Sequence, residues 1–286
     1  MLRLPEHRQR EVGFRRRGEH VAELEQLGYG TIWFPGGGRA GLADHIASLL
    51  QATRRVTVAT GIVNIWTHPA AEIAAEHQAI AQAHPGRFLL GLGISHQRVV
   101  EGAGLTYERP LQKMRSYLDE LDAAPTPVPV EVRILASLGP LSLKMARERS
   151  AGTHPYFMPV EHTRISRRAV GTGKIVAPEQ MVVVEGNPDK ARSIARASMD
   201  RYLHTPNYTS NLLRLGYTED DLANGGSDRL VDALIAWGDP GKIMQRVREH
   251  HDAGADHVCI QVLTESPEDL KAAMDGWRQL AGVFAH

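Results

Sequence analysis

Residue types suited to proton chemistry gather after one glycine-bearing run of this sequence. The run Gly91-Leu92-Gly93 is followed by Ser95 and His96. An imidazole titrates near neutral pH, so His96 could act as a catalytic general acid, or it could simply donate a hydrogen bond to a bound ring. The run opens like a dinucleotide-binding fingerprint, but His96 stands where the third glycine belongs, which argues against a nicotinamide-binding Rossmann unit.

Aromatic and polar residues also follow the other apolar runs that we interpret as strands. They are Trp33 and Phe34, the run from Gly61 to Trp66, Ser137 and Gly139, His154 and Tyr156, and Gln261. In a barrel of parallel strands these carboxyl ends share the functional face. The set is apolar with few charges, which favours a large flat conjugated ligand. Helix-start amides after Ser137 could bind a phosphate, although Ser137 could equally be an ordinary helix cap.

Motifs for other chemistries are missing from the sequence. There is no Walker loop, no His-Glu-x-x-His helix and no Gly-x-Ser-x-Gly elbow. The pairs His68 with Glu72 and His250 with His251 are isolated, and we expect no metal site. A barrel isomerase or hydrolase would need a carboxylate pair or a metal at the strand ends, and neither is evident. Cys259 is the single cysteine and is expected to be a buried hydrophobe.

Charge and hydropathy exclude several classes of partner. Lys plus Arg and Asp plus Glu both total 33, so net charge gives no attraction to nucleic acid or to an anionic membrane. No stretch approaches the ~20 apolar residues that a transmembrane helix needs. The N-terminus carries charges where a signal peptide has an apolar core. We therefore expect a cytoplasmic protein that acts on a small molecule.

Strand-like and helix-like runs alternate along the chain of 286 residues. The predicted strands are Gly30–Phe34, Val56–Val63, Arg87–Gly93, Val130–Ala136, Gly152–Met158, Met181–Val184 and Val258–Leu263. The predicted helices are Val21–Leu27, Leu42–Leu50, Ala70–Ala83, Pro110–Leu121, Leu141–Arg149, Glu161–Ala169, Asp189–Tyr202, Lys242–Asp252 and Pro267–Val283. This alternation predicts a parallel sheet, and the uniformly apolar strands indicate that both of its faces are covered.

The fold that fits best is an α/β protein, a (β/α)₈ TIM barrel with an insertion. It forms one domain over residues 1–286 with an elaborated segment at about 204–239, and a doubly wound sheet is the alternative. The first strand is weak or missing, since only Leu2–Leu4 or Val12–Phe14 could supply it. Either one of these runs fills the gap, or the strand is encoded upstream of Met1.

Several blocks resemble the bacterial luciferase-like superfamily, and most closely its actinobacterial coenzyme F420-dependent oxidoreductases. The similarity extends from about Val21 to the C-terminus. The blocks are Leu27–Trp33, Val58–Trp66, Pro85–His96, Ala151–Phe157 with Pro159–Thr163, and Gly254–Gln261. The resemblance implies a (β/α)₈ barrel, a homodimer, and hydride transfer between F420 and a small organic substrate. The alternatives that it leaves are an FMN-dependent monooxygenase and a degenerate deazaflavin-binding paralogue without turnover.

The resemblance also implies roles for particular residues. The strand that ends near Val63 should contain a bulge with a non-prolyl cis peptide bond, by position Gly61–Ile62, that backs the cofactor ring. Cofactor contacts would come from Gly61, Ile62, Val63, Asn64, Gly93, Ser95, Ser137, Leu138, Gly139, His154, Pro155 and Tyr156. Substrate contacts would come from Trp33, Phe34 and Trp66, and His96 would be the catalytic residue. The substrate itself and the direction of the reaction stay open.

Overall fold

The strands of this protein run parallel in two neighbouring sheets. The computed structural model describes residues 18–36, 41–266 and 268–283. The strands are β1 (Thr31–Phe34), β2 (Thr57–Thr60), β3 (Val63–Asn64), β4 (Phe88–Gly93), β5 (Arg133–Leu135), β6 (Gly152–Thr153), β7 (Ile175–Val176), β8 (Glu179–Val183), β9 (Ile235–Trp237) and β10 (Cys259–Val262).

Helices separate most of these strands. Described residues 18–26 are helical. The labelled helices are α2 (Leu42–Ala52), α3 (Ala70–Ala83), α4 (Gln97–Gly102), α5 (Pro110–Asp122), α6 (Pro140–Arg149), α7 (Val160–Val170), α8 (Pro188–Leu203), α9 (Pro206–Arg214), α10 (Glu219–Leu222), α11 (Asp228–Leu234), α12 (Pro240–Asp252) and α13 (Leu270–Ala281), with a 3₁₀ turn at Val130–Val132. None of the described helices is long and apolar enough to cross a membrane.

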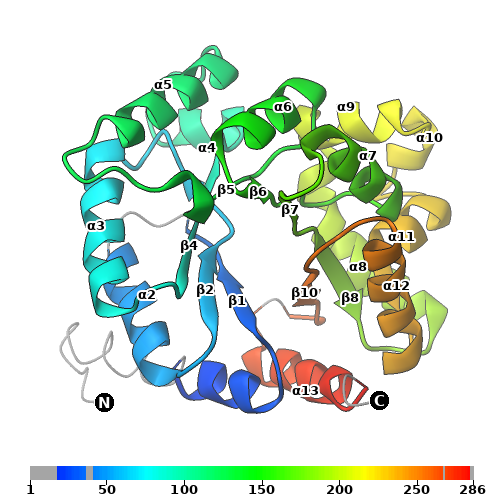
Figure 1. Ribbon diagram of the computed structural model, residues 1–286. Helices are drawn as coiled ribbons and strands as arrows, with labels where there is room; N and C mark the ends of the chain where they lie inside the picture. The colour runs from blue at the N-terminus through cyan, green and yellow to red at the C-terminus, as the bar shows by residue number, and fades with distance from the viewer. Residues whose placement is uncertain (1–17, 37–40, 267, 284–286) are drawn as a thin grey trace, which may run out of the picture.

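The two sheets curl around a common centre and the helices lie outside them (Figure 1). One sheet has the order β1-β2-β4-β5-β6-β7, with β3 also paired to β4, and the other has the order β10-β8-β9. Only Ala177 and Pro178 separate β7 from β8, so the chain passes directly from one sheet to the other. This arrangement confirms the prediction of a barrel of the TIM type.

The barrel is open on one side in the part of the chain that the structure describes. In that part β1 and β10 are edge strands of their sheets, and no described strand links the one to the other. The two weak candidates for a first strand, Leu2–Leu4 and Val12–Phe14, lie outside the described residues. Side chains still bridge the opening, because the Trp33 indole Nε1 donates to His257 Nε2 at 3.1 Å.

Several details of the predicted strands were wrong. The single run Val56–Val63 is broken after Thr60, and Gly152–Met158 contributes only its first two residues. The strands β7 and β9 were missed because each has only two or three residues, too few to show a period. Strand β9 also lies in the elaborated segment, which was interpreted as helical patches and loops.

The strands β8 and β10 show how the barrel separates its inner side from its outer side. Val182 of β8 and Ile260 of β10 pack outward with the α12 residue Ile243 and the α13 residue Leu280. Successive strand residues point to opposite faces. Glu179 and Met181 of β8, like Cys259 and Gln261 of β10, therefore point toward the inner side. Alternation thus decides which side chains can meet a ligand inside the barrel.

A buried polar network ties α7 and α12 to the outer face of β8. His250 is fully buried, and its Nε2 donates to Gln180 Oε1 at 2.9 Å while its Nδ1 lies 2.8 Å from Thr163 Oγ1. The Gln180 amide nitrogen donates to the carbonyls of Met181 and Leu234. Burial, with Arg246 and His251 nearby, lowers the pKa of His250 to about 4. Both ring nitrogens are satisfied, so His250 has a structural role.

We predict that His250 makes the protein less stable in mild acid. Its folded pKa lies below the value of about 6.5 expected in an unfolded chain, so the unfolded state binds more protons between these values. This contribution to stability is present above pH ~6.5 and is lost as the pH falls through about 4; it amounts to about 3 kcal/mol. In H250Q the free energy of unfolding should fall by about 1–3 kcal/mol at pH 7.5, and its acid dependence should flatten.

Urea unfolding at a series of pH values measures both effects. The exposed His204 provides the matched control, and H204Q should keep the wild-type curve. Parallel pH curves for H250Q and the wild type would contradict the prediction.

Candidate functional site

A β-bulge interrupts the second strand at the carboxyl end of the barrel. Ala59 pairs with Leu89, and Val63 pairs with Leu92. Four residue steps on the first strand therefore face three on the second, so the first strand carries one extra residue. The Thr60 hydroxyl replaces the missing backbone bond, since it accepts from the Gly91 N–H at 2.8 Å and donates to the Gly91 carbonyl at 2.9 Å. Within the bulge, the peptide bond between Gly61 and Ile62 is cis, as the resemblance implied.

Glycines allow the bulged chain to approach its neighbours. A Cβ atom on Gly93 would lie 2.5 Å from Ile62 Cδ1, so the Ile62 side chain occupies the space above this glycine. A Cβ atom on Gly36 would lie 3.0 Å from the Ile62 carbonyl oxygen. The structure therefore brings Gly61, Ile62 and Gly93 together at the bulge, and their role as cofactor contacts stays a prediction.

Asn64 and Trp66 form a turn directly after the bulge. The Asn64 side-chain oxygen accepts from the Trp66 N–H at 3.0 Å, and the Trp66 indole donates to the Ile94 carbonyl at 2.9 Å. The Trp66 ring lies 5.3 Å from that of Tyr107. The Asn64 oxygen is thus used within the protein, which leaves its amide nitrogen as the group that could meet a ligand.

Polar and aromatic residues meet on the inner side beside the bulge, and of these His154 is buried while the others are partly buried. We call Trp33, Gly61, His154, Glu179 and His257 the inner cluster. The rings of Trp33 and His154 stack at 4.0 Å with an angle of 10° between their planes. A Cβ atom on Gly61 would lie 3.3 Å from His154 Nε2. Burial, with His154 close by, lowers the pKa of His257 to about 4, so His257 is neutral at pH 7.

Sequence reasoning missed two members of the inner cluster, Glu179 and His257. Glu179 starts its strand, whereas the search considered strand ends and began this strand at Met181. His257 lies in the turn that precedes β10. The signal available for Glu179 was the strand period of two, which places it on the same face as Met181 and Val183.

A cluster of aromatic rings lies beside the inner cluster, and we call it the tyrosine cluster: Tyr156, Phe157, Tyr202 and Tyr208. The Tyr156 hydroxyl is 2.8 Å from that of Tyr202 and 3.1 Å from Gln261 Oε1. Burial is the main reason why the pKa values of Tyr156 and Tyr208 are raised, so both are neutral at pH 7. Tyr202 and Tyr208 come from α8 and α9, and the sequence gave no signal for either.

His96 lies at the edge of the tyrosine cluster. Its ring is 5.1 Å from that of Tyr208, and burial lowers its pKa. Its Nδ1 is buried and has no hydrogen-bond partner among the described residues. The preceding residue, Ser95, has a φ of 54°, an uncommon conformation for a residue other than glycine. A neutral imidazole with one free nitrogen is suited to bind a ligand atom.

The loop from Ser137 to Gly139 leads into α6 as predicted, but Ser137 is not the helix cap. The N-cap is Gly139, without a side-chain hydrogen bond, and Ser137 is buried. The first amides of α6 therefore have no capping side chain. A Cβ atom on Gly139 would lie 3.9 Å from Arg214 Nη1, so a guanidinium group that the sequence analysis missed lies beside this helix start.

Leu138 and Pro155 also lie among these loops. The Leu138 carbonyl is 2.9 Å from His162 Nε2, and the Pro155 carbonyl accepts from the Glu179 N–H at 2.9 Å. Phe34, in contrast, is not brought to this site. It lies on the face of β1 opposite to Trp33, 4.8 Å from His45, and lines an outer groove of about 480 Å³ between β1, α2 and α13.

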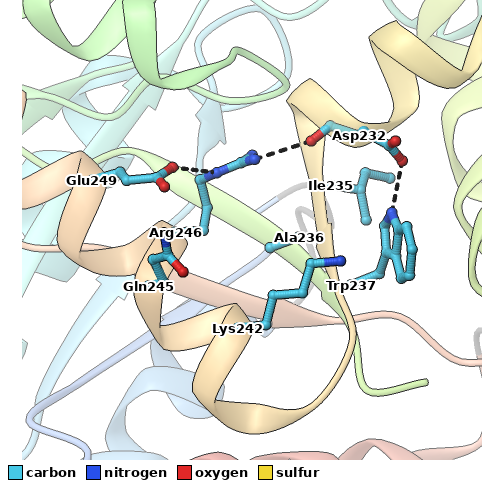
Figure 2. A pocket seen from close by; sticks show the side chains of 8 residues that line it. All are labelled: Asp232, Ile235, Ala236, Trp237, Lys242, Gln245, Arg246 and Glu249. Atoms are coloured by element: carbon cyan, nitrogen blue, oxygen red, sulfur yellow. Dashed lines mark hydrogen bonds and ion pairs between the residues drawn. The ribbon is translucent and has the colours of Figure 1, made fainter. Parts of the chain in front are cut away.

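A separate polar cavity of about 270 Å³ lies between α11, β9 and α12 (Figure 2). Its charged groups already have partners. Asp232 accepts from the Trp237 indole at 2.7 Å, Arg246 pairs with Glu249 at 2.9 Å, and the Lys242 ammonium lies 3.6 Å from the centre of the Trp237 ring. Asp232, Arg246 and Glu249 are thus already paired, so the inner cluster is the better candidate.

No group of three or more His, Cys, Asp or Glu side chains in the described part of the chain is placed to hold a metal ion. The inner cluster combines the stacked rings of Trp33 and His154, Gly61 of the bulged strand and the unpaired Nε2 of His154. Such a site suits a flat ligand with a polar edge.

Known proteins with this architecture include enzymes with two related cofactors. A 5,10-methylenetetrahydromethanopterin reductase of Archaeoglobus fulgidus is 23% identical over an alignment of 300 positions, and the alignment covers 84% of this chain and 87% of the relative. The structure of an F420-dependent secondary alcohol dehydrogenase with an F420-acetone adduct matches with a TM-score of 0.67 at 16% identity, over 93% of this chain and 94% of the other.

A third match is the oxygenating constituent of 3,6-diketocamphane monooxygenase from Pseudomonas putida with FMN. It has a TM-score of 0.69 at 14% identity, over 94% of this chain and 90% of the other. The model of the luciferase-like monooxygenase family matches residues 2–257. The chain therefore belongs to the luciferase-like monooxygenase family.

Proposed function

We propose that this protein is an oxidoreductase that uses coenzyme F420 to transfer a hydride to or from a small organic substrate. The observation that carries the proposal is the bulge at Gly61–Ile62, whose isoleucine covers Gly93 as an apolar wall and whose glycine lies beside His154 and Trp33 of the inner cluster. Such a wall can back a flat ring. The buried, unpaired Nδ1 of His96 supplies a polar group near the same strand end, which fits a ring with a polar edge.

Different residues around the site would bind different parts of the cofactor. Ile62, Val63 and Gly93 would support the ring, and Asn64, Ser95 and His96 would meet its polar edge. The uncapped amides after Ser137, Leu138 and Gly139, together with Arg214 and the turn His154–Tyr156, would hold an anionic tail. Trp33 and Trp66 would contact the substrate. Phe34, which the sequence analysis gave the same role, is left out because it lines the outer groove. The bound cofactor supplies the hydride chemistry, and the protein supplies orientation and a dry site.

FMN is the alternative cofactor, since the fold also occurs in a monooxygenase structure with FMN. The other alternative is a degenerate paralogue that binds the deazaflavin but has no turnover. The homodimer and the cytoplasmic location stay predictions.

Titration of the purified protein with F420 and with FMN, followed by tryptophan emission, tests the proposal. We expect quenching by F420 with a Kd at or below the micromolar range, because Trp33 lies beside the bulge, where a Cβ atom on Gly61 would be 3.7 Å from Trp33 Cε3. FMN should bind more weakly. Tighter binding of FMN would favour the monooxygenase alternative, and binding of neither would reject the site.

We predict that Gly93→Ala weakens cofactor binding without unfolding the protein. The new Cβ would displace the flexible end of Ile62, so the apolar wall would shift. The Kd should rise roughly tenfold, which is about 1.4 kcal/mol. Gly102→Ala is the matched control, since a Cβ there meets nothing within 4 Å. Equal Kd values for both variants, with unchanged melting temperatures, would show that Ile62 does not form the wall.

A further inference from the structure

We propose that His68 is a positioning residue, which holds Asn64 in the orientation that meets the bound ligand. One buried water molecule joins the His68 ring to Glu76 of α3 and Tyr117 of α5. This inference rests on the proposed function, in which Asn64 meets the polar edge of the cofactor ring. It goes beyond that function because it gives a role to side chains that do not touch the ligand.

The side chain of Asn64 has one fixed orientation. Its Oδ1 accepts from the Trp66 N–H at 3.0 Å. Because a backbone N–H only donates, the atom that faces it must be the oxygen, and the amide nitrogen is the group left for a ligand. Asn64 is 6% exposed, so small movements of its backbone decide whether this nitrogen reaches a ligand atom that accepts a hydrogen bond.

His68 holds the backbone of Asn64. The Asn64 carbonyl accepts from the N–H groups of Thr67 and His68, both at 3.2 Å, and His68 Nδ1 lies 3.1 Å from the same oxygen. A carbonyl only accepts, so this third contact requires the ring proton to be on Nδ1. The Thr67 hydroxyl, 3.0 Å from Nδ1, can accept from the same proton. Loss of the ring would free the turn that carries the Asn64 side chain.

The other ring nitrogen of His68 faces a polar layer between α3 and α5. With the proton on Nδ1, Nε2 is an acceptor. It is buried and has no hydrogen-bond partner among the described residues, and the same is true of Glu76 Oε2 and of the Tyr117 hydroxyl. His68 is 3% exposed and Tyr117 is 1% exposed, so bulk water does not satisfy them.

These three groups belong to neighbouring elements. His68 lies just before α3, which carries Glu76 and packs against α5. Burial raises the pKa of Glu76, and the charge of His68 opposes this rise. Burial also raises the pKa of Tyr117, and the carboxylates of Glu120 and Glu76 raise it further. Glu76 is therefore within electrostatic reach of both rings.

One water molecule matches the three unpaired atoms. His68 Nε2 and the Glu76 carboxylate oxygen are acceptors, and the Tyr117 hydroxyl is a donor. A water molecule has two protons to donate and an oxygen that accepts, and buried waters typically make about three hydrogen bonds to such groups. The water keeps an acceptor-type Nε2 satisfied, which fixes the ring proton on the side of Asn64.

Nitrogen-15 NMR of the histidine rings tests the contact with Asn64 in protein without cofactor. We identify the His68 signals by their absence from the spectrum of His68→Asn. At about pH 9, where imidazoles are neutral, the His68 ring should carry its proton on Nδ1. A proton on Nε2 would overturn the proposal, because Nδ1 could then not donate to the Asn64 carbonyl.

A high-resolution crystal structure tests the water. It should show one water molecule at hydrogen-bond distance from His68 Nε2, Glu76 Oε2 and the Tyr117 hydroxyl. Direct contacts among these side chains, with no water between them, would overturn this part of the proposal.

Titration with F420 tests the positioning role. His68→Leu should raise the Kd about tenfold, which is about 1.4 kcal/mol. His68→Asn keeps an N–H donor for the Asn64 carbonyl and should stay within about threefold of the wild type, while Tyr117→Phe should weaken binding about threefold. Tyr29→Phe is the control, because the bond from Tyr29 to the Trp277 carbonyl lies outside this layer, and it should keep the wild-type Kd.

The comparison of the two His68 variants decides the outcome. Equal losses of affinity in His68→Leu and His68→Asn would assign the effect to packing, and wild-type affinity in both would remove any effect on the ligand, so either result overturns the positioning role. Melting temperatures show that each variant is folded during the titration. If the wild type binds no F420, the proposed function fails, whereas the ring spectrum still decides whether His68 holds the Asn64 turn.

Discussion

The close approach of Thr60 to Gly91 is the constraint on which the rest of the site depends. A Cβ atom at position 91 would lie 1.8 Å from the Thr60 carbonyl oxygen, so only glycine fits there. The Thr60 hydroxyl closes the gap in the ladder by bonding both the N–H and the carbonyl of Gly91. The bulge can therefore form between the two strands while the N–H and the carbonyl of Gly91 keep hydrogen-bond partners. The position of Ile62 and the turn at Asn64 both depend on this contact.

The histidines show how the structure separates structural groups from groups available for chemistry. His250 and His162 are buried, and both ring nitrogens of each lie at hydrogen-bond distance from a protein atom. His68, His96 and His154 each keep one buried nitrogen without a hydrogen-bond partner among the described residues. An unpaired buried polar atom costs about 1–3 kcal/mol, so a bound group that satisfies it would recover this energy. The nitrogens of His96 and His154 lie at the carboxyl end of the barrel, where a TIM barrel binds its ligands.

Family membership defines the fold and the general chemistry but does not choose the cofactor. The fold is shared with enzymes whose structures contain F420 and FMN, at identities of 16% and 14%. At such distances the side chains inside the barrel decide what is bound and what reacts. In this chain the carboxylate identified next to the stacked rings is Glu179, and it belongs to the start of a strand.

The sequence by itself determined the parallel α/β architecture and the order of the main elements, because these follow from local periodicity. The position of the cis bond followed only from the resemblance of contiguous blocks of the sequence to a known family. Only the tertiary structure decided that Phe34 points outward, that Glu179 meets His154, and that Tyr202 and Tyr208 reach the site from α8 and α9. The physical reason is that the side of a strand to which a residue points depends on register, and the meeting of distant helices and strands depends on packing of the whole barrel. Short strands such as β7 and β9 form because neighbouring strands pair with them, and so they left no period in the sequence.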